Sequence, residues 1–99
     1  MKYTVTVRAR LRETPAAAKK YHDEVTSATR AAAKQAGDLT HAVYLDPKDH
    51  KAFFGVDTWS SLEGIQSFAG SPQIREFFGK LFDGEPEVRV WIDSDWNQW

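Results

Sequence analysis

The sequence predicts an α+β protein in which strands and helices follow one another in the order β-α-β-β-α-β, with four strands in one antiparallel sheet. Apolar and polar residues alternate over residues 3–11 and again over 88–92, which is the period of a half-buried strand. Between these segments lie two stretches where apolar residues recur every three or four positions, the period of a helix that packs on one side. This order is the ferredoxin-like arrangement.

The first strand and the first helix have clear boundaries in the sequence. The strand is expected from Tyr3 to Leu11. Thr14 followed by Pro15 predicts a helix start, because the hydroxyl can cap free amides and proline suits the first turn. Gly37 is a suitable residue to end this helix. The apolar stripe expected to face the sheet consists of Ala18, Tyr21, Val25, Ala28 and Ala32.

The middle of the chain predicts a hairpin followed by an interrupted helix. Strands at residues 41–45 and 52–59 flank a short polar turn. Ser60 and Glu63 have the spacing of a capping box, which predicts a helix start directly after the hairpin. The Ser-Pro pair at 71–72 then breaks this helix and restarts it.

Composition bounds the class of protein. The 99 residues are expected to form a single domain, residues 1–99, with a modest core. A formal net charge of −1 argues against nucleic acid as a partner, since phosphate binding requires a basic surface. The absence of cysteine excludes disulfides and thiolate chemistry. No apolar run reaches the roughly 20 residues of a membrane span, and the N-terminal residues alternate instead of forming a signal core. We therefore expect a cytoplasmic protein without a membrane partner.

Two helices can cover only one face of the predicted sheet. The other face is expected to carry the side chains that alternate with the core positions, namely Thr4, Thr6, Arg8, Arg10, Arg89 and Trp91. Such a face could be solvated, as in many antiparallel sheets, and the chain would then be a monomer. Alternatively, it packs against a second copy of the chain and encloses a cavity. The aromatic residues on this face favour the homodimer, because exposed aromatic patches usually mark interfaces.

A motif at the end of the second hairpin strand points to a known family. Asp57 and Trp59 lie two positions apart at the end of that strand. Ser61 and Glu63 follow at the start of a helix, and the Ser-Pro pair at 71–72 breaks it. Together with the preceding segment HAVYLDPKD, this pattern resembles the antibiotic-biosynthesis-monooxygenase branch of the dimeric α/β-barrel superfamily. The resemblance covers nearly the whole chain by the order of its elements.

The resemblance implies a dimer with a small-molecule pocket in each half. Some members oxidise aromatic polyketides without a cofactor, using the acidity of the substrate and a few polar groups that stabilise its anion. Many members are expected to carry histidines where this chain has Phe68 and Gln73, and neither of these side chains can transfer a proton near neutral pH. Haem-degrading members need an iron ligand on the same helix, so haem degradation is disfavoured and no cofactor is expected.

Three residues are candidates for catalysis. Arg8 lies mid-strand on the presumed cavity face and could hold a carboxylate or enolate through paired donors, although an ion pair with Asp57 or Asp93 explains it equally well. Asp57 could act as a general base if burial raised its pKa, whereas pairing with Arg8 would lower that pKa, so the two functions exclude each other. His41 opens a strand and could reach the rim of the cavity, although a lone histidine there is more often structural.

Other residues are candidates for substrate binding. Tyr44 and Trp91 could form an apolar wall for a planar substrate, with Thr6 beside them and Trp59 shaping the corner of the cavity. Packing in the core or at the interface explains the aromatic residues without any ligand.

The remaining histidines carry no predicted function. His22 is expected at the surface or at the boundary of the core, beside the apolar stripe, and His50 lies in a polar loop. No pair of histidines at helical spacing and no His-Glu pattern predicts a metal site.

Three functional hypotheses remain open from the sequence. The first is a cofactor-free monooxygenase, or a related isomerase, that acts on a small aromatic or enolisable compound. The second is a non-catalytic ligand-binding or stress-associated protein of the same fold. The third is a structural dimer or assembly module. The missing histidines favour the second and third, and the polar pair of Thr6 and Arg8 in an aromatic cavity favours the first.

Overall fold

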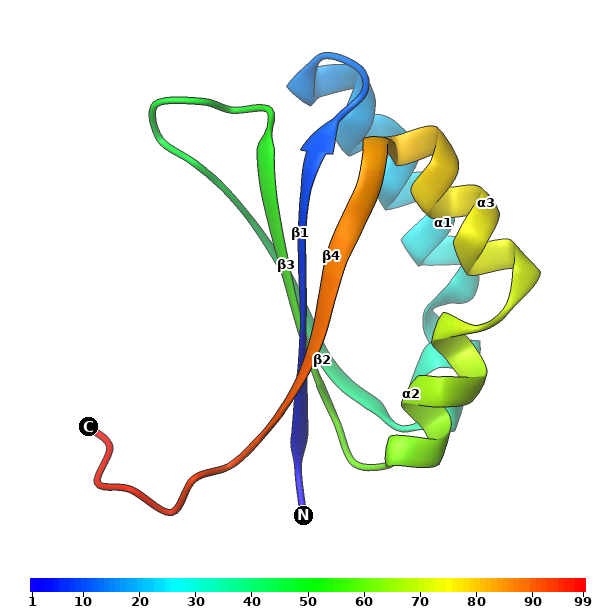
Figure 1. The fold of residues 1–99 in the computed structure, drawn as a ribbon. Helices are drawn as coiled ribbons and strands as arrows, with labels where there is room; N and C mark the ends of the chain where they lie inside the picture. The colour runs from blue at the N-terminus through cyan, green and yellow to red at the C-terminus, as the bar shows by residue number, and fades with distance from the viewer.

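A computed structural model describes all 99 residues and confirms the predicted order of elements, with the second helix divided into two (Figure 1). The elements are β1 (Tyr3–Leu11), α1 (Pro15–Ala36), β2 (Asp38–Leu45), β3 (Ala52–Trp59), α2 (Leu62–Ala69), α3 (Pro72–Leu81) and β4 (Phe82–Ile92). The strands form one antiparallel sheet in the order β2-β3-β1-β4, which confirms the ferredoxin-like fold.

All three helices lie on one side of the sheet, and the C-terminal residues extend away from them (Figure 1). The remaining face of the sheet has no helix against it. None of the helices is long and apolar enough to cross a membrane.

The pairing register shows which side chains face the helices. Val7 pairs with Gly55 and Val88, and Leu11 pairs with Phe82. Because neighbouring residues of a strand point to opposite faces and paired residues point to the same face, each pair shares a side of the sheet. The core cluster lies on the helix side and contains Leu11, Ala18, Phe53, Phe77, Leu81 and Phe82. The helix-facing positions of β1 are therefore the apolar ones, as the alternation predicts.

The helices cover only part of their face of the sheet. Only 10 of the 99 residues are buried. Val88, Val90 and Ile92 belong to the helix-facing side by register, yet their exposed fractions are 45%, 46% and 63%. The helix layer therefore packs tightly at one end of the sheet and leaves an apolar surface uncovered along β4.

Helix α1 turns the first part of the predicted stripe toward the sheet, since Ala18 is buried and Tyr21 and Val25 pack on the core. Ala28 and Ala32 are exposed, so their predicted inward position is wrong, whereas Ala33 is buried and His22 and Thr29 are half-buried. The difference arises because this helix is rich in alanine, which fits either side, so the alanines do not fix the rotation of the helix about its axis.

The helix ends are capped largely as expected. The Thr14 hydroxyl accepts a hydrogen bond from the Ala17 amide at 3.3 Å, and Gly37 ends α1 with a left-handed φ of 116°. The cap of α2 is Ser61, which accepts from the Gly64 amide at 3.0 Å, so the predicted capping box based on Ser60 is wrong. Ser60 instead donates to the Gly37 carbonyl at 3.3 Å and ties the end of β3 to the end of α1.

Two strands begin earlier than the sequence predicts. β2 begins at Asp38, directly after the glycine that ends α1, and β4 begins at Phe82, directly after α3. Gly84 lies inside β4 with a φ of 85°, where the pairing with β1 shifts register between Arg8 and Arg10. The glycine therefore marks a bulge inside the strand.

The first turn of α2 touches the end of α1. A Cβ atom at Gly64 would lie 1.9 Å from the carbonyl oxygen of Ala36, which is far inside van der Waals contact. Only glycine allows the two helices to approach this closely.

The substitution Gly64→Ala should lower the free energy of unfolding by about 2–3 kcal/mol, because either helix must move away to admit the methyl group. Urea denaturation followed by circular dichroism measures this change. The matched control is Gly79→Ala on α3, where the added Cβ has nothing within 4 Å. That change should raise stability by about 0.5–1 kcal/mol through helix propensity. Equal effects at the two positions would contradict the close approach of α1 and α2.

Candidate functional site

The predicted site residues lie on opposite faces of the sheet. Arg8 pairs with Phe54 and Glu87, whereas Asp57 pairs with Val5 and His41. Successive positions of β1 alternate between the two faces, so Arg8 lies on the open face and Asp57 faces the helices. By the same register, Thr6, Tyr44 and Trp91 share the open face, and His41 and Trp59 share the helix side. The structure therefore does not bring the predicted residues into one cavity of a single chain.

The alternative prediction of an ion pair between Arg8 and Asp57 is wrong, because the two side chains lie on opposite faces of the sheet. Arg8 forms no ion pair with any other residue of the chain, Asp93 included. An ion pair with Arg8 therefore does not oppose the use of Asp57 as a base.

The open face is aromatic at its surface. The indole N–H of Trp91 donates to the Thr6 hydroxyl at 2.9 Å, and this bond ties the indole to β1. Tyr44 is 57% exposed, Trp91 49% and Phe54 36%. These side chains form an unpartnered patch on the side of the sheet away from the helices.

The helix side carries a hydrogen-bonded pair of His41 and Asp57. These residues lie opposite each other on β2 and β3, and the ring N–H at Nδ1 of His41 donates to Oδ1 of Asp57 at 2.7 Å. This hydrogen bond raises the pKa of His41 above its ordinary value, against the opposing effect of burial. An imidazole held in this way is oriented and has an increased affinity for a proton.

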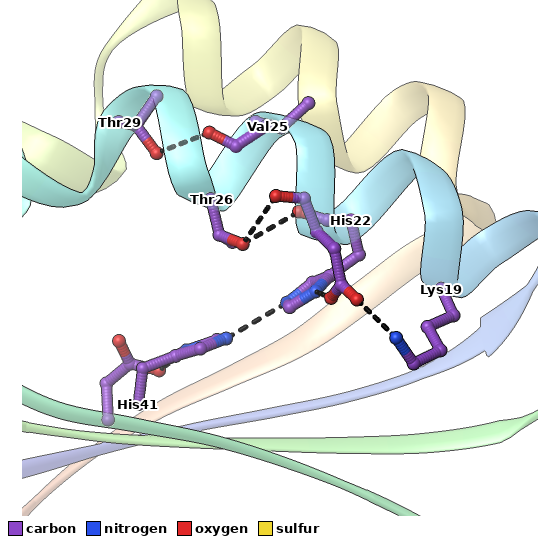
Figure 2. Close-up of polar contacts among 8 residues, drawn as sticks. Lys19, His22, Val25, Thr26, Thr29 and His41 are labelled. Atoms are coloured by element: carbon purple, nitrogen blue, oxygen red, sulfur yellow. Dashed lines mark hydrogen bonds and ion pairs between the residues drawn. The ribbon is translucent and has the colours of Figure 1, made fainter.

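His22 joins this pair from α1, although the sequence predicts no function for it. Its Nε2 atom lies 2.9 Å from Nε2 of His41, and its Nδ1 atom lies 3.0 Å from Oδ1 of Asp23 (Figure 2). The side chain of His22 is only 13% exposed, so it lies at the boundary of the core and not at the open surface. Lys19 also binds Asp23, and the two partners, Lys19 first, lower the pKa of Asp23.

The local structure of α1 explains how this face tolerates polar groups. The hydroxyl of Thr26 donates to the carbonyl of His22 at 2.9 Å, and that of Thr29 donates to the carbonyl of Val25 at 2.9 Å (Figure 2). Both half-buried hydroxyls are thereby satisfied within the helix. The ring of Phe77 from α3 packs on the His22 ring with centroids 6.0 Å apart. The imidazole is thus held on its helix and directed toward the sheet.

Asp38, the first residue of β2, completes the cluster, and the sequence did not single it out. Its Oδ1 atom is buried and has no hydrogen-bond partner. Burial, followed by the neighbouring Asp57 carboxylate, raises the pKa of Asp38 from 3.8 to about 8. At neutral pH Asp38 therefore carries a proton while Asp57 accepts a hydrogen bond from His41. Two carboxyl groups in such different states are the usual mark of an acid and base pair.

An apolar surface adjoins this acid–base cluster. Across the sheet, Asp57 pairs with Val5, which pairs with Val90, and the next row runs through Tyr3 to Ile92. Neighbouring strands lie only about 4.8 Å apart, so the surface begins directly beside the Asp57 carboxyl. The exposure of Val90 and Ile92 leaves room for a flat apolar molecule on this side of β4.

Trp59 closes one end of this surface as a packing residue. It is only 4% exposed, and its ring packs on Phe68 of α2 with centroids 5.6 Å apart. The family resemblance implies histidine at positions 68 and 73. The apolar ring of Phe68 occupies the first position, and the second is Gln73, which is exposed on α3.

Other parts of the surface offer less chemistry. A depression of about 400 Å³ lies between the start of α1 and the end of α3, lined by residues that include Arg12, Tyr21 and Lys80. It contains none of the predicted site residues. The structure has no group of three or more side chains placed to hold a metal ion.

The comparison with known proteins agrees with the fold. The family model described as antibiotic biosynthesis monooxygenase matches residues 4–80. The chain belongs to this family. No curated protein sequence matches it significantly.

Solved structures share this architecture at low sequence identity. SnoaB, a cofactor-independent oxygenase from Streptomyces nogalater, is 13% identical in a mutant form, with a TM-score of 0.73 over 93% of this chain and 92% of that chain. Rv0793 from Mycobacterium tuberculosis is 19% identical, with a TM-score of 0.71 over 99% of this chain and 100% of that chain. These identities establish the fold, which is a monooxygenase-like one, and not the reaction.

The substitution Asp38→Asn tests the carboxyl pair, because an amide resembles the protonated acid. In the wild type, the folded protein binds the Asp38 proton more tightly than the unfolded chain does, so stability is lost as pH rises from about 4 toward 8. The amide has no such proton, so the substitution removes this loss. Between pH 5 and pH 8, the free energy of unfolding of the variant should rise relative to that of the wild type by on the order of 1 kcal/mol. This value is smaller than the pKa shift of Asp38 alone implies, because water screens the half-exposed carboxyl. Urea denaturation at the two pH values measures this difference, and a pH-independent difference would contradict the pairing.

Proposed function

We propose that this chain is a cofactor-independent monooxygenase acting on a small aromatic or enolisable compound bound beside Asp57, on the helix side of the sheet. The observation that carries the proposal is the cluster in which His41 holds Asp57 at 2.7 Å while Asp38 lies beside it with a raised pKa. The cluster adjoins the exposed apolar surface of Val90 and Ile92, which suits a planar substrate.

The chemistry assigns a separate function to each carboxyl group. Asp57 takes a proton from a phenolic or enolic substrate and leaves the electron pair on the substrate. The resulting anion is oxidised by O2 and forms a carbon–oxygen bond. Cleavage of the oxygen–oxygen bond leaves one oxygen as a carbonyl and releases the other as water, which takes up the two protons that the substrate lost. Asp57 returns the proton that it took, and Asp38 donates the second proton. Asp38 then recovers a proton from the oxidised carbon as the carbonyl forms, so both carboxyl groups regain their starting states.

The same base also supports the isomerase alternative. Moving a proton between two carbon atoms of an enolisable compound requires removal and return of one proton by Asp57, without oxygen. A non-catalytic ligand-binding or stress-associated protein is the second candidate, favoured by the apolar Phe68 and the exposed Gln73 at positions where histidine is expected in the family.

Asp57→Asn should reduce oxygen uptake by about 100-fold or more with a reactive quinol such as 1,4-dihydroxynaphthalene, because the amide cannot accept the proton. An oxygen electrode measures the rate after subtraction of the uncatalysed reaction. The matched control is His50→Gln in the exposed β2–β3 turn, which should keep the wild-type rate.

Full activity of Asp57→Asn would contradict the assignment of the base. Tight quinol binding by the wild type without any oxygen uptake or isomerisation would favour the ligand-binding candidate.

We further propose that two copies of the chain pack through their open faces to form a homodimer. Support comes from the exposed aromatic patch of Tyr44, Phe54 and Trp91 on a sheet face that no helix covers. In this arrangement Thr6 and Arg8 lie at the centre of the interface, where Arg8 can bind an anion or a carboxylate of the partner.

Tyr44→Arg should convert the dimer into a monomer, because the interface would then bury additional unpaired cations near Arg8. Light scattering should give twice the chain mass of 11.2 kDa for the wild type and about that mass for the variant. Leu62→Glu on α2 is the control, since Leu62 is an exposed apolar residue on the helix side, and it should leave the dimer intact. A monomeric wild type at micromolar concentration would remove the proposed interface.

A further inference from the structure

The two histidines between α1 and the sheet form a symmetrical arrangement. Nδ1 of His22 faces Oδ1 of Asp23 at 3.0 Å, and Nδ1 of His41 faces Oδ1 of Asp57 at 2.7 Å. The two Nε2 atoms face each other at 2.9 Å (Figure 2). The ring planes differ by only 17°, so the rings meet edge to edge with the geometry of an N–H···N hydrogen bond.

The carboxylates decide where the ring protons lie. An ionised carboxylate can only accept hydrogen bonds, so each Nδ1 atom must carry a hydrogen. Asp23 is held in its ionised form by Lys19, and Asp57 accepts the hydrogen bond from Nδ1 of His41. With both Nδ1 atoms protonated, two neutral rings would direct lone pairs at each other across 2.9 Å. One additional proton between the Nε2 atoms removes this repulsion.

We propose that His22 and His41 share a single proton between their Nε2 atoms and act as one cationic unit, with His22 as the positioning residue that holds the charge beside Asp57. The unit then bridges two carboxylates in the order Asp23, His22, His41, Asp57, so negative and positive charges alternate from α1 to β3. The shared proton follows from the contacts of the two rings with each other and with their carboxylates, whereas its use in catalysis rests on the proposed function.

Charged groups face the histidine pair from several packed elements. Helix α1 contributes Lys19 and Asp23 beside His22, and Lys34 beside Asp38. Strands β2 and β3 contribute Asp38 and Asp57. Helix α3 contributes the uncharged ring of Phe77. Of the charged groups, only the carboxylates of Asp23 and Asp57 contact the rings directly, at 3.0 Å and 2.7 Å.

In the proposed reaction, the positive charge has a definite use. When Asp57 has taken the substrate proton, the negative charge moves to the substrate anion next to it. The cation at His22 and His41 attracts the Asp57 carboxylate before the transfer and the substrate anion after it, so it stabilises that anion without any rearrangement and without opposing the transfer. Asp38 stays neutral beside it, so the site does not accumulate a second negative charge.

Nitrogen NMR of the protein with ¹⁵N-labelled histidine tests the shared proton directly. At neutral pH we expect a coupling between the two Nε2 nuclei through the hydrogen bond, and a titration in which His22 and His41 change together. His50, which is exposed in the β2–β3 turn, serves as the internal reference and should titrate independently. This measurement uses the wild-type chain and requires neither substrate nor turnover.

His22→Leu should lower the proton affinity of His41 by about tenfold, because an imidazole acceptor at Nε2 is lost. His50→Gln is the matched control and should leave His41 unchanged. In the oxygen-uptake assay, kcat of the wild type should fall at alkaline pH, and in His22→Leu this fall should occur at a lower pH. KM should stay nearly unchanged, because His22 does not line the apolar surface.

Independent titration of His22 and His41 without the nitrogen coupling would overturn the proposal. A change in the histidine nitrogen NMR spectrum on addition of a chelator would also overturn the proposal, because a metal ion and not a proton would then join the two rings. If the coupling is present but no quinol is turned over, the shared proton stands and the proposed oxygenase function fails.

Discussion

The pairing register of β1 with β3 is the constraint on which the rest of the structure depends. Val5 lies opposite Asp57 and Val7 lies opposite Gly55, so the apolar positions of the central strand share a face with the Asp57 carboxyl. A shift of one residue would move Asp57 to the open face beside Arg8, where a guanidinium would neutralise it. The observed register keeps the carboxylate and the arginine apart and leaves Asp57 free to pair with His41.

The second determining feature is that the helix layer covers its side of the sheet incompletely. The core cluster packs α1 and α3 against the Leu11 end of the sheet, and Gly64 fixes α2 to the end of α1. Between these contacts the helices are joined to the sheet by polar groups, chiefly the bond from His22 to His41. Polar contacts and an exposed apolar surface therefore lie side by side, as a small-molecule site requires. A fully packed core would be more stable but would leave no such surface.

The sequence predicted the fold well because alternation, caps and turn residues are local signals. The faces of β1 follow directly from the alternation of Val7 and Arg8, and Thr14 and Gly37 bound α1 as expected. The site was predicted only in part. Asp57 and His41 were singled out, but their contact depends on the register between β2 and β3, which no local pattern specifies. His22 was missed because the alanines of α1 do not fix which side of the helix faces inward, although the spacing of Ala18, His22, Val25, Thr29 and Ala33 is the helical period that could have revealed it. Asp38 was missed because β2 was expected to begin at His41.

The most direct test of this account is to find which face of the sheet binds an aromatic substrate. Methyl-labelled valine NMR with 1,4-dihydroxynaphthalene, under anaerobic conditions, distinguishes the faces, because Val5 and Val90 lie on the helix side and Val56 lies on the open face. The account predicts that the methyl signals of Val5 and Val90 shift on binding while those of Val56 stay in place. Shifts confined to Val56 would place the ligand beside Arg8 and contradict a site built on Asp57.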